Sequence, residues 1–149
     1  MKSKMLTPDL SVMPQVSEAD IAELSRCGFR SIISNRPEGE SPDQPEWSAI
    51  AAAAHRHGMA ARHIPVVASQ IDDEDIAAFA AALRDLPTPI AAFCRTGTRA
   101  ALLWALANED SLTADERLRI AAAQGFDLAP FRARIEQLHT ADAAAGRDD

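Results

Sequence analysis

Short apolar runs alternate with helical patterns along most of this chain, and this alternation restricts the possible folds more than any other feature. Runs of strand length occupy residues 10–12, 29–33, 61–66 and 90–93, and helical patterns occupy residues 17–27, 45–57, 72–83, 99–106, 113–124 and 128–138. Strands that alternate with helices form a mainly parallel sheet with helices on both faces. The sequence therefore predicts an α/β fold, with chemistry at the carboxyl ends of the strands.

Length and composition predict one domain over residues 1–149, with a frayed, solvated tail at 141–149. No apolar run approaches the ~20 residues of a membrane span, and no apolar stretch follows the N-terminal lysines as it would in a secretory signal. We therefore expect a soluble, cytoplasmic protein. The net charge of −7 argues against nucleic acid as a partner, because nucleic acids are bound by basic surfaces.

Residues 90–99 place a cysteine at the end of an apolar run and follow it with two arginines, two threonines and a glycine. A loop between a strand and a helix can direct backbone N–H groups at one point, beside the positive end of the helix dipole. Arg95 and Arg99 add charge there, and both favour the thiolate form of Cys94. Gly97 permits the turn that the loop requires. Cys94 is therefore expected to be a nucleophile in an anion-binding loop rather than a structural cysteine.

Other candidate residues have two readings each. Arg36 and Glu40 are expected either to orient a substrate or to form an ordinary surface ion pair. Thr96 and Thr98 are expected either to donate O–H bonds to a thiolate or persulfide or to cap the following helix. Cys27 precedes a glycine that ends a helix, and we expect it to be a small buried residue.

The histidines do not suggest a metal site. His55 and His57 are two residues apart on a helix and cannot share a face. His63 is expected to be structural, and His139 lies near the frayed end. We therefore expect a cysteine-dependent enzyme with no metal and no organic cofactor.

Two families resemble parts of this chain. The sequence Cys-Arg-Thr-Gly-Thr-Arg at 94–99 closely resembles the active-site loop of single-domain rhodaneses, whose cysteine carries sulfane sulfur as a persulfide. The segments 34–40, 44–45, 63–66 and the cysteine loop, in this order, resemble the phosphatase-like domain of beta-lactamase hydrolase-like proteins, over about residues 6–138. That resemblance implies a fold similar to dual-specificity protein phosphatases. It also implies that Gln44 lines the substrate pocket.

Three departures from the phosphatase pattern favour sulfur chemistry. Four residues separate Cys94 from Arg99, whereas the phosphatase signature has five, and a shorter loop should make a tighter ring of N–H donors. Phe93 stands where phosphatases usually have histidine. The stretch 67–70 lacks the general-acid aspartate of this phosphatase class, and the first carboxylates after it, Asp72, Asp73 and Asp75, are more simply a helix start.

We therefore expect a rhodanese-like sulfurtransferase in which Cys94 forms a persulfide and Arg99 and Arg95 bind the anionic donor. The substrate would be a small anion such as thiosulfate, a persulfide or a phosphate ester, and a protein could serve as sulfur donor or acceptor. The alternative is a phosphatase that forms a phosphocysteine. Against the rhodanese reading, the chain after the loop lacks the Gly-Gly and Trp pattern expected near a rhodanese C-terminus. A third reading is a non-catalytic module that senses anions or persulfides, against which the intact cysteine and two arginines argue.

Overall fold

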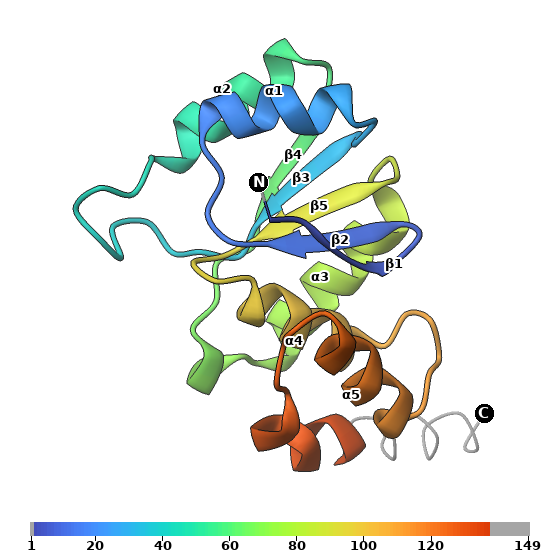
Figure 1. Ribbon diagram of the computed structural model, residues 1–149. Coiled ribbons are helices and arrows are strands. Elements are labelled where there is room, and N and C mark those ends of the chain that lie inside the picture. The colour runs from blue at the N-terminus through green and yellow to red at the C-terminus, as the bar shows by residue number, and fades with distance from the viewer. Residues whose placement is uncertain (1, 138–149) are drawn as a thin grey trace.

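A computed structural model describes residues 2–137 of the chain. Its strands are β1 (Lys4–Thr7), β2 (Leu10–Met13), β3 (Ser31–Ser34), β4 (Ala60–His63) and β5 (Ile90–Phe93). Within the described residues they form one five-stranded sheet with the order β1-β2-β5-β3-β4 (Figure 1). Only the β1–β2 pair is antiparallel. The prediction of a mainly parallel sheet is confirmed.

Helices cover both faces of this sheet, as Figure 1 shows. The helices are α1 (Glu18–Arg26), α2 (Trp47–Arg56), α3 (Asp73–Asp85), α4 (Thr98–Ala107) and α5 (Ala114–Ala123). α1 and α2 lie on one face, and α3 and α4 lie on the other, with α5 packed outside α4. The predicted two-faced arrangement is therefore confirmed, and each face has its own hydrophobic cluster.

The central strand β5 joins the two clusters. Ala92 belongs to the cluster on the α3 and α4 side, whereas Ala91 and Phe93 belong to the cluster under α1 and α2. Successive side chains of a strand point to opposite faces, and a strand buried on both faces is a continuous apolar run. All four residues of β5 are buried, so the strand holds Cys94, the next residue, at a fixed place on the carboxyl edge.

Helix α4 follows the cysteine loop and is buried on all sides. Every residue from Ala100 to Leu106 is buried, as expected for a helix enclosed between a sheet and other helices. Its N-terminus is therefore held rigidly at the same edge as the end of β5.

Several predicted boundaries differ from the structure. The strand predicted at 29–33 spans Ser31–Ser34, because Gly28 turns the chain with a positive φ and the Phe29 N–H donates to Leu24 O of α1. The strand predicted at 61–66 spans Ala60–His63 and stops before Pro65. Strand β1 was not predicted, because its short run is exposed on one side and begins with a lysine.

The C-terminal helix predicted at 128–138 begins as a 3-10 turn (Ala129–Phe131) and continues as helix through residues 132–137. The predicted tail at 141–149 and His139 lie outside the described residues. Within residues 2–137, no helix is long and apolar enough to cross a membrane.

Candidate functional site

Cys94 lies at the carboxyl end of β5, at the start of the cysteine loop (residues 94–99). Its Sγ accepts a hydrogen bond from the Gly97 N–H at 3.1 Å, and the residue is 0% exposed. Gly97 is the N-cap of α4, so the sulfur lies at the positive end of that helix dipole. The loop therefore brings together a thiol, a backbone donor and a helix terminus, as the sequence predicts.

Position 97 requires glycine for two reasons. Its φ is +97°, in the left-handed region of the backbone that residues other than glycine rarely adopt. A Cβ there would also lie 3.0 Å from Cε1 of Phe126 and 3.3 Å from the carbonyl carbon of Met13. Close packing around Gly97 therefore fixes the N–H that reaches Cys94.

Arg99 is held from two sides. Its Nη1 and Nη2 donate to the two carboxylate oxygens of Glu40 at 2.7 and 2.8 Å, and Nη1 also donates to the carbonyl of Val66 at 3.0 Å. Bidentate pairs fix the plane of a guanidinium group. The hydrogen bonds to Glu40 raise the pKa of Arg99 above its usual range although partial burial opposes the shift, and the nearby Cys94 side chain adds to the rise.

Glu40 also accepts a hydrogen bond from a second arginine, Arg36. Arg36 donates from Nε to Glu40 at 3.0 Å and from Nη1 to Oε1 of Gln15 at 3.0 Å. The hydrogen bond from Arg99, with help from Arg36, lowers the pKa of Glu40 from 4.5 to about 2 although partial burial opposes the shift. Arg36 is only 5% exposed, so the reading of Arg36 and Glu40 as an ordinary surface ion pair is wrong.

Gln44 forms hydrogen bonds with the backbone of the segment that carries Glu40. Its Oε1 accepts from the Glu40 N–H at 2.9 Å, and its Nε2 donates to the carbonyl of Pro37 at 2.8 Å. Gln44 also lines a hollow of about 280 Å³ whose other lining residues are Gln15, Arg36, Ser41, Asp43, Pro45 and Arg95. The structure thus brings Arg36, Glu40, Gln44 and Arg99 together, as predicted.

The two threonines take neither of their predicted roles in full. Thr96 Oγ1 accepts from the Thr98 N–H at 3.4 Å, and Thr96 donates its own hydroxyl to Thr98 at 3.1 Å. The N-cap of α4 is Gly97, without a side-chain cap. Thr96 and Arg95 are exposed, whereas Thr98 is half-buried.

The aspartates that follow the 3-10 turn Ala68–Gln70 serve the start of α3. Asp72 is the N-cap: its carboxylate accepts from the Asp75 N–H at 2.8 Å, and the Asp75 carboxylate accepts from the Asp72 N–H at 3.1 Å. Each carboxylate in this reciprocal box satisfies a donor that the helix leaves open. Asp72 and Asp75 are therefore occupied as helix caps.

Cys27 departs from its prediction, because it is exposed. Helical spacing would place it on the face of Leu24, but α1 ends at Arg26 and Cys27 is the C-cap, where that spacing no longer applies.

His63, predicted to be structural, stacks on Trp47 with ring centroids 5.2 Å apart, and its Nε2 lies 2.9 Å from the carbonyl of Arg36.

Three residues of the site were not predicted from the sequence. Gln15 holds Arg36, the Val66 carbonyl holds Arg99, and buried Asn35 donates from Nδ2 to Ile64 O at 2.9 Å. All three follow the carboxyl ends of β2, β4 and β3. The sequence does show that each residue lies at or just after the end of a predicted strand. That position predicts the edge of the sheet where the residue lies, but it does not predict which side chain or backbone group the residue contacts.

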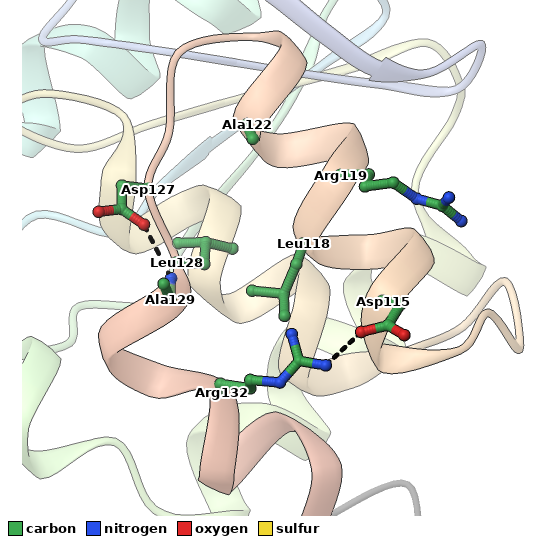
Figure 2. A pocket seen from close by; sticks show the side chains of 8 residues that line it. All are labelled: Asp115, Leu118, Arg119, Ala122, Asp127, Leu128, Ala129 and Arg132. Carbon is green, nitrogen blue, oxygen red and sulfur yellow. Dashed lines mark hydrogen bonds and ion pairs between the residues drawn. The ribbon is translucent and has the colours of Figure 1, made fainter.

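A separate hollow of about 440 Å³ lies between α5 and the turn at 127–132. Figure 2 shows its apolar residues Leu118 and Leu128 and the ion pair of Arg132 with Asp115 at its edge. Among residues 2–137, no cysteine, serine or histidine lines it. It therefore offers no nucleophile comparable to Cys94.

The mainly parallel sheet covered on both faces, with a cysteine loop between β5 and α4, gives the chain a phosphatase-like α/β fold, which is also the fold of Tk-PTP and PTPMT1 at 13% and 10% identity. Residues 2–111 match the family model for the phosphatase-like domain of beta-lactamase hydrolase-like proteins, and the chain belongs to this family. The resemblance of the sequence to this family is confirmed. Family membership also confirms the prediction of an enzyme and supports a hydrolase, with which a cysteine nucleophile is consistent.

Individual relatives agree with this assignment. A beta-lactamase hydrolase-like protein from Xylella fastidiosa is 36% identical over 130 residues, which cover 86% of this chain and 30% of that protein. The chain therefore spans less than a third of the length of the curated relatives it matches. The structure of a putative phosphatase from Neisseria meningitidis is 33% identical with a TM-score of 0.84, covering 93% of this chain and 99% of that one.

A more distant structure, P. aeruginosa TpbA in complex with pTyr, has a TM-score of 0.66 and 16% identity, covering 95% of this chain and 90% of that one. At this identity it supports the fold alone. The family is described as phosphatase-like and the Neisseria structure is that of a putative phosphatase, so these two findings support the alternative reading of a phosphatase rather than the expected sulfurtransferase.

Proposed function

We propose that this chain hydrolyses phosphate monoesters through a covalent phosphocysteine at Cys94. The observation that carries the proposal is the position of this thiol: it accepts the N–H of the α4 N-cap, lies beside Arg99, and does so in a fold shared with phosphatases. A nucleophile at a helix N-terminus suits a substrate whose reacting group is itself an anion.

The reaction has two displacements. The Cys94 thiolate attacks phosphorus, an S–P bond forms, and the ester P–O bond breaks with its electron pair passing to the departing oxygen. Water then attacks phosphorus, the S–P bond breaks, and inorganic phosphate leaves with the thiolate restored. Arg99 and the loop N–H groups bind the non-bridging oxygens in both steps.

Glu40 acts in this proposal by positioning Arg99. Its two carboxylate oxygens receive both terminal nitrogens of the guanidinium, and Arg36 with Gln44 holds Glu40 in turn. A carboxyl with a pKa of about 2 is ionised at neutral pH and cannot donate a proton to the departing oxygen. Glu40 is therefore assigned to orientation and not to acid catalysis.

The placement of the three candidate acids bears on substrate choice. Asp72 and Asp75 cap α3, and Asp73 is exposed in the first turn of that helix, so esters whose departing oxygen needs no proton should react best. We therefore expect aryl phosphates to be better substrates than alkyl phosphates.

The proposal is tested with 4-nitrophenyl phosphate as substrate. Wild type should release 4-nitrophenolate and Cys94→Ser should not, whereas Cys27→Ser should match wild type because that thiol is exposed at the C-cap of α1. Full activity of Cys94→Ser would remove this residue from the reaction.

Sulfur transfer is a second candidate function, and one observation favours it. Four residues separate Cys94 and Arg99, one fewer than the phosphatase signature. In that reaction the thiolate attacks the sulfane sulfur of thiosulfate, sulfite departs with the S–S electron pair, and cyanide removes the sulfur as thiocyanate. Thiocyanate formation that depends on Cys94, with no ester hydrolysis, would select this candidate.

A further inference from the structure

Beside the cysteine loop lies a basic hollow of about 440 Å³, lined by Lys2, Lys4, Arg95, Thr96, Pro14 and Phe126 among others. Arg95 and Thr96 belong to the loop itself. Phe126 packs so closely on Gly97 that a Cβ there would lie 3.0 Å from its ring. The hollow therefore adjoins the backbone that holds the Cys94 sulfur.

The charge of this hollow is uniform. Of the lining residues within the described part of the chain, three are cationic and none carries a carboxylate. Lys2, Lys4 and Arg95 form no ion pair within residues 2–137. The pKa of Asp43 is lowered mainly by its hydrogen bond with Ser41, and Arg95 makes only the smallest contribution. In a chain with a net charge of −7, both lysines of the sequence lie here. Concentrated positive charge in a hollow attracts anions.

Of the three cationic residues in the hollow, Lys4 has a structural role that accounts for its charge. Lys4 lies on β1, and lysine on an edge strand blocks pairing with other chains. That role does not extend to Arg95 in the cysteine loop or to Lys2 ahead of the strand. It also leaves unexplained why the three line one hollow with an aromatic ring.

We propose that the basic hollow binds a second anionic group of the substrate, a carboxylate or a phosphate, while the scissile phosphate lies on Cys94 and Arg99. The apolar surfaces of Phe126 and Pro14 would contact the part of the substrate between its two charges. This inference rests on the proposed function and deepens it, because it assigns the substrate class: phosphate monoesters that carry a second negative charge.

The experiment compares matched substrate pairs. One pair is a short phosphotyrosyl peptide with glutamates beside the phosphotyrosine and the same peptide with glutamines. The other is an aryl phosphate with a second phosphate on the ring and the corresponding monophosphate. Wild type should prefer the more charged member of at least one pair in kcat/KM by about 3- to 10-fold, with the preference falling as salt rises. The pair that responds identifies the source of the second charge.

The variant K2Q/K4Q should bring that ratio close to one. Its matched control is R30Q/R62Q, which removes the same charge from two exposed arginines that do not line the hollow and form no described ion pair. Equal rates for both members of both pairs, or equal loss of the ratio in both double variants, would overturn the proposal. If wild type hydrolyses none of the esters, the proposed function fails instead, and binding of the same peptides to Cys94→Ser then decides about the hollow alone.

Discussion

Arg99 and Glu40, 59 positions apart in sequence, face each other across the carboxyl edge of the sheet and share two hydrogen bonds of 2.7 and 2.8 Å. This pair ties the cysteine loop to the segment after β3. Arg36 donates to the same carboxylate, and Gln44 accepts a hydrogen bond from the backbone N–H of Glu40. The ordered position of Arg99 therefore depends on residues far from Cys94 in sequence.

The pair should make stability depend on pH in the acid range. Arg99 and Arg36 lower the pKa of Glu40 to about 2 in the folded protein, below the usual 4.5, so the unfolded chain binds the proton first as pH falls. The stabilisation is complete above about pH 5 and is lost between there and pH 2. We expect Glu40→Gln to lower the free energy of unfolding on the order of 1–2 kcal/mol at pH 7, a figure discounted for partial exposure.

Urea denaturation of wild type and Glu40→Gln at a series of pH values measures this difference. The two curves should converge as pH falls towards 2. A difference that stays constant over the whole range would show that the ionised carboxylate is not its source.

Replacing Arg99 by lysine should impair catalysis more than folding. Lysine keeps the charge but cannot make the bidentate pair with Glu40, so the cation would no longer be fixed beside Cys94. We expect kcat/KM for an aryl phosphate to fall by about 10²- to 10³-fold. The matched control is Arg62→Lys on β4, an exposed residue that should keep wild-type rates.

Gly97→Ala should disturb both the loop and the fold. The substitution combines a left-handed backbone with contacts to Phe126 and Met13, and we expect a loss of roughly 2–4 kcal/mol in the free energy of unfolding. Gly28→Ala is the control, since Gly28 has the similar φ of +95° but open space around it. Its cost should be about 1 kcal/mol, from strain alone. Equal losses in the two variants would mean that close packing at Gly97 has no effect.

The fold was largely predictable, because its information is local. The apolar run of β5, the capping residues before α1 and α3, and the glycines after α1 and α2 each act within a few residues. Strand β1 was missed because its pairing with β2 is a tertiary contact that its short sequence does not signal. The exposure of Cys27 was missed because periodicity fails at a helix end.

The candidate site was predictable in its residue types but not in its contacts. Cys94, Gly97 and Arg99 lie within one loop, so their proximity follows from the sequence. Glu40 meets Arg99 only because β3 and β5 are neighbours in the sheet, and strand order is set by tertiary packing. The fit of Val66 O and Gln15 to the arginines depends on loop geometry that no local pattern encodes.

Asparagine at the capping aspartates should leave turnover of aryl phosphates almost unchanged. Asparagine caps helices nearly as well as aspartate, so Asp72→Asn and Asp75→Asn should fold normally. We expect kcat within about threefold of wild type, whereas loss of a general acid slows a reaction by ~10²- to 10⁴-fold. A large drop in kcat with 4-nitrophenyl phosphate in either variant, with its pH profile altered on the basic side, would identify that residue as the acid.

The central claim is a covalent phosphocysteine, and rapid acid quench of enzyme turning over an aryl phosphate tests it most directly. Mass spectrometry of the quenched protein should find one phosphoryl group, located on Cys94, in wild type and in Cys27→Ser. The modification should be absent from Cys94→Ser. Steady turnover without any phosphorylated Cys94 would contradict the account, as would sulfur on Cys94 after thiosulfate in an enzyme that hydrolyses no phosphate ester.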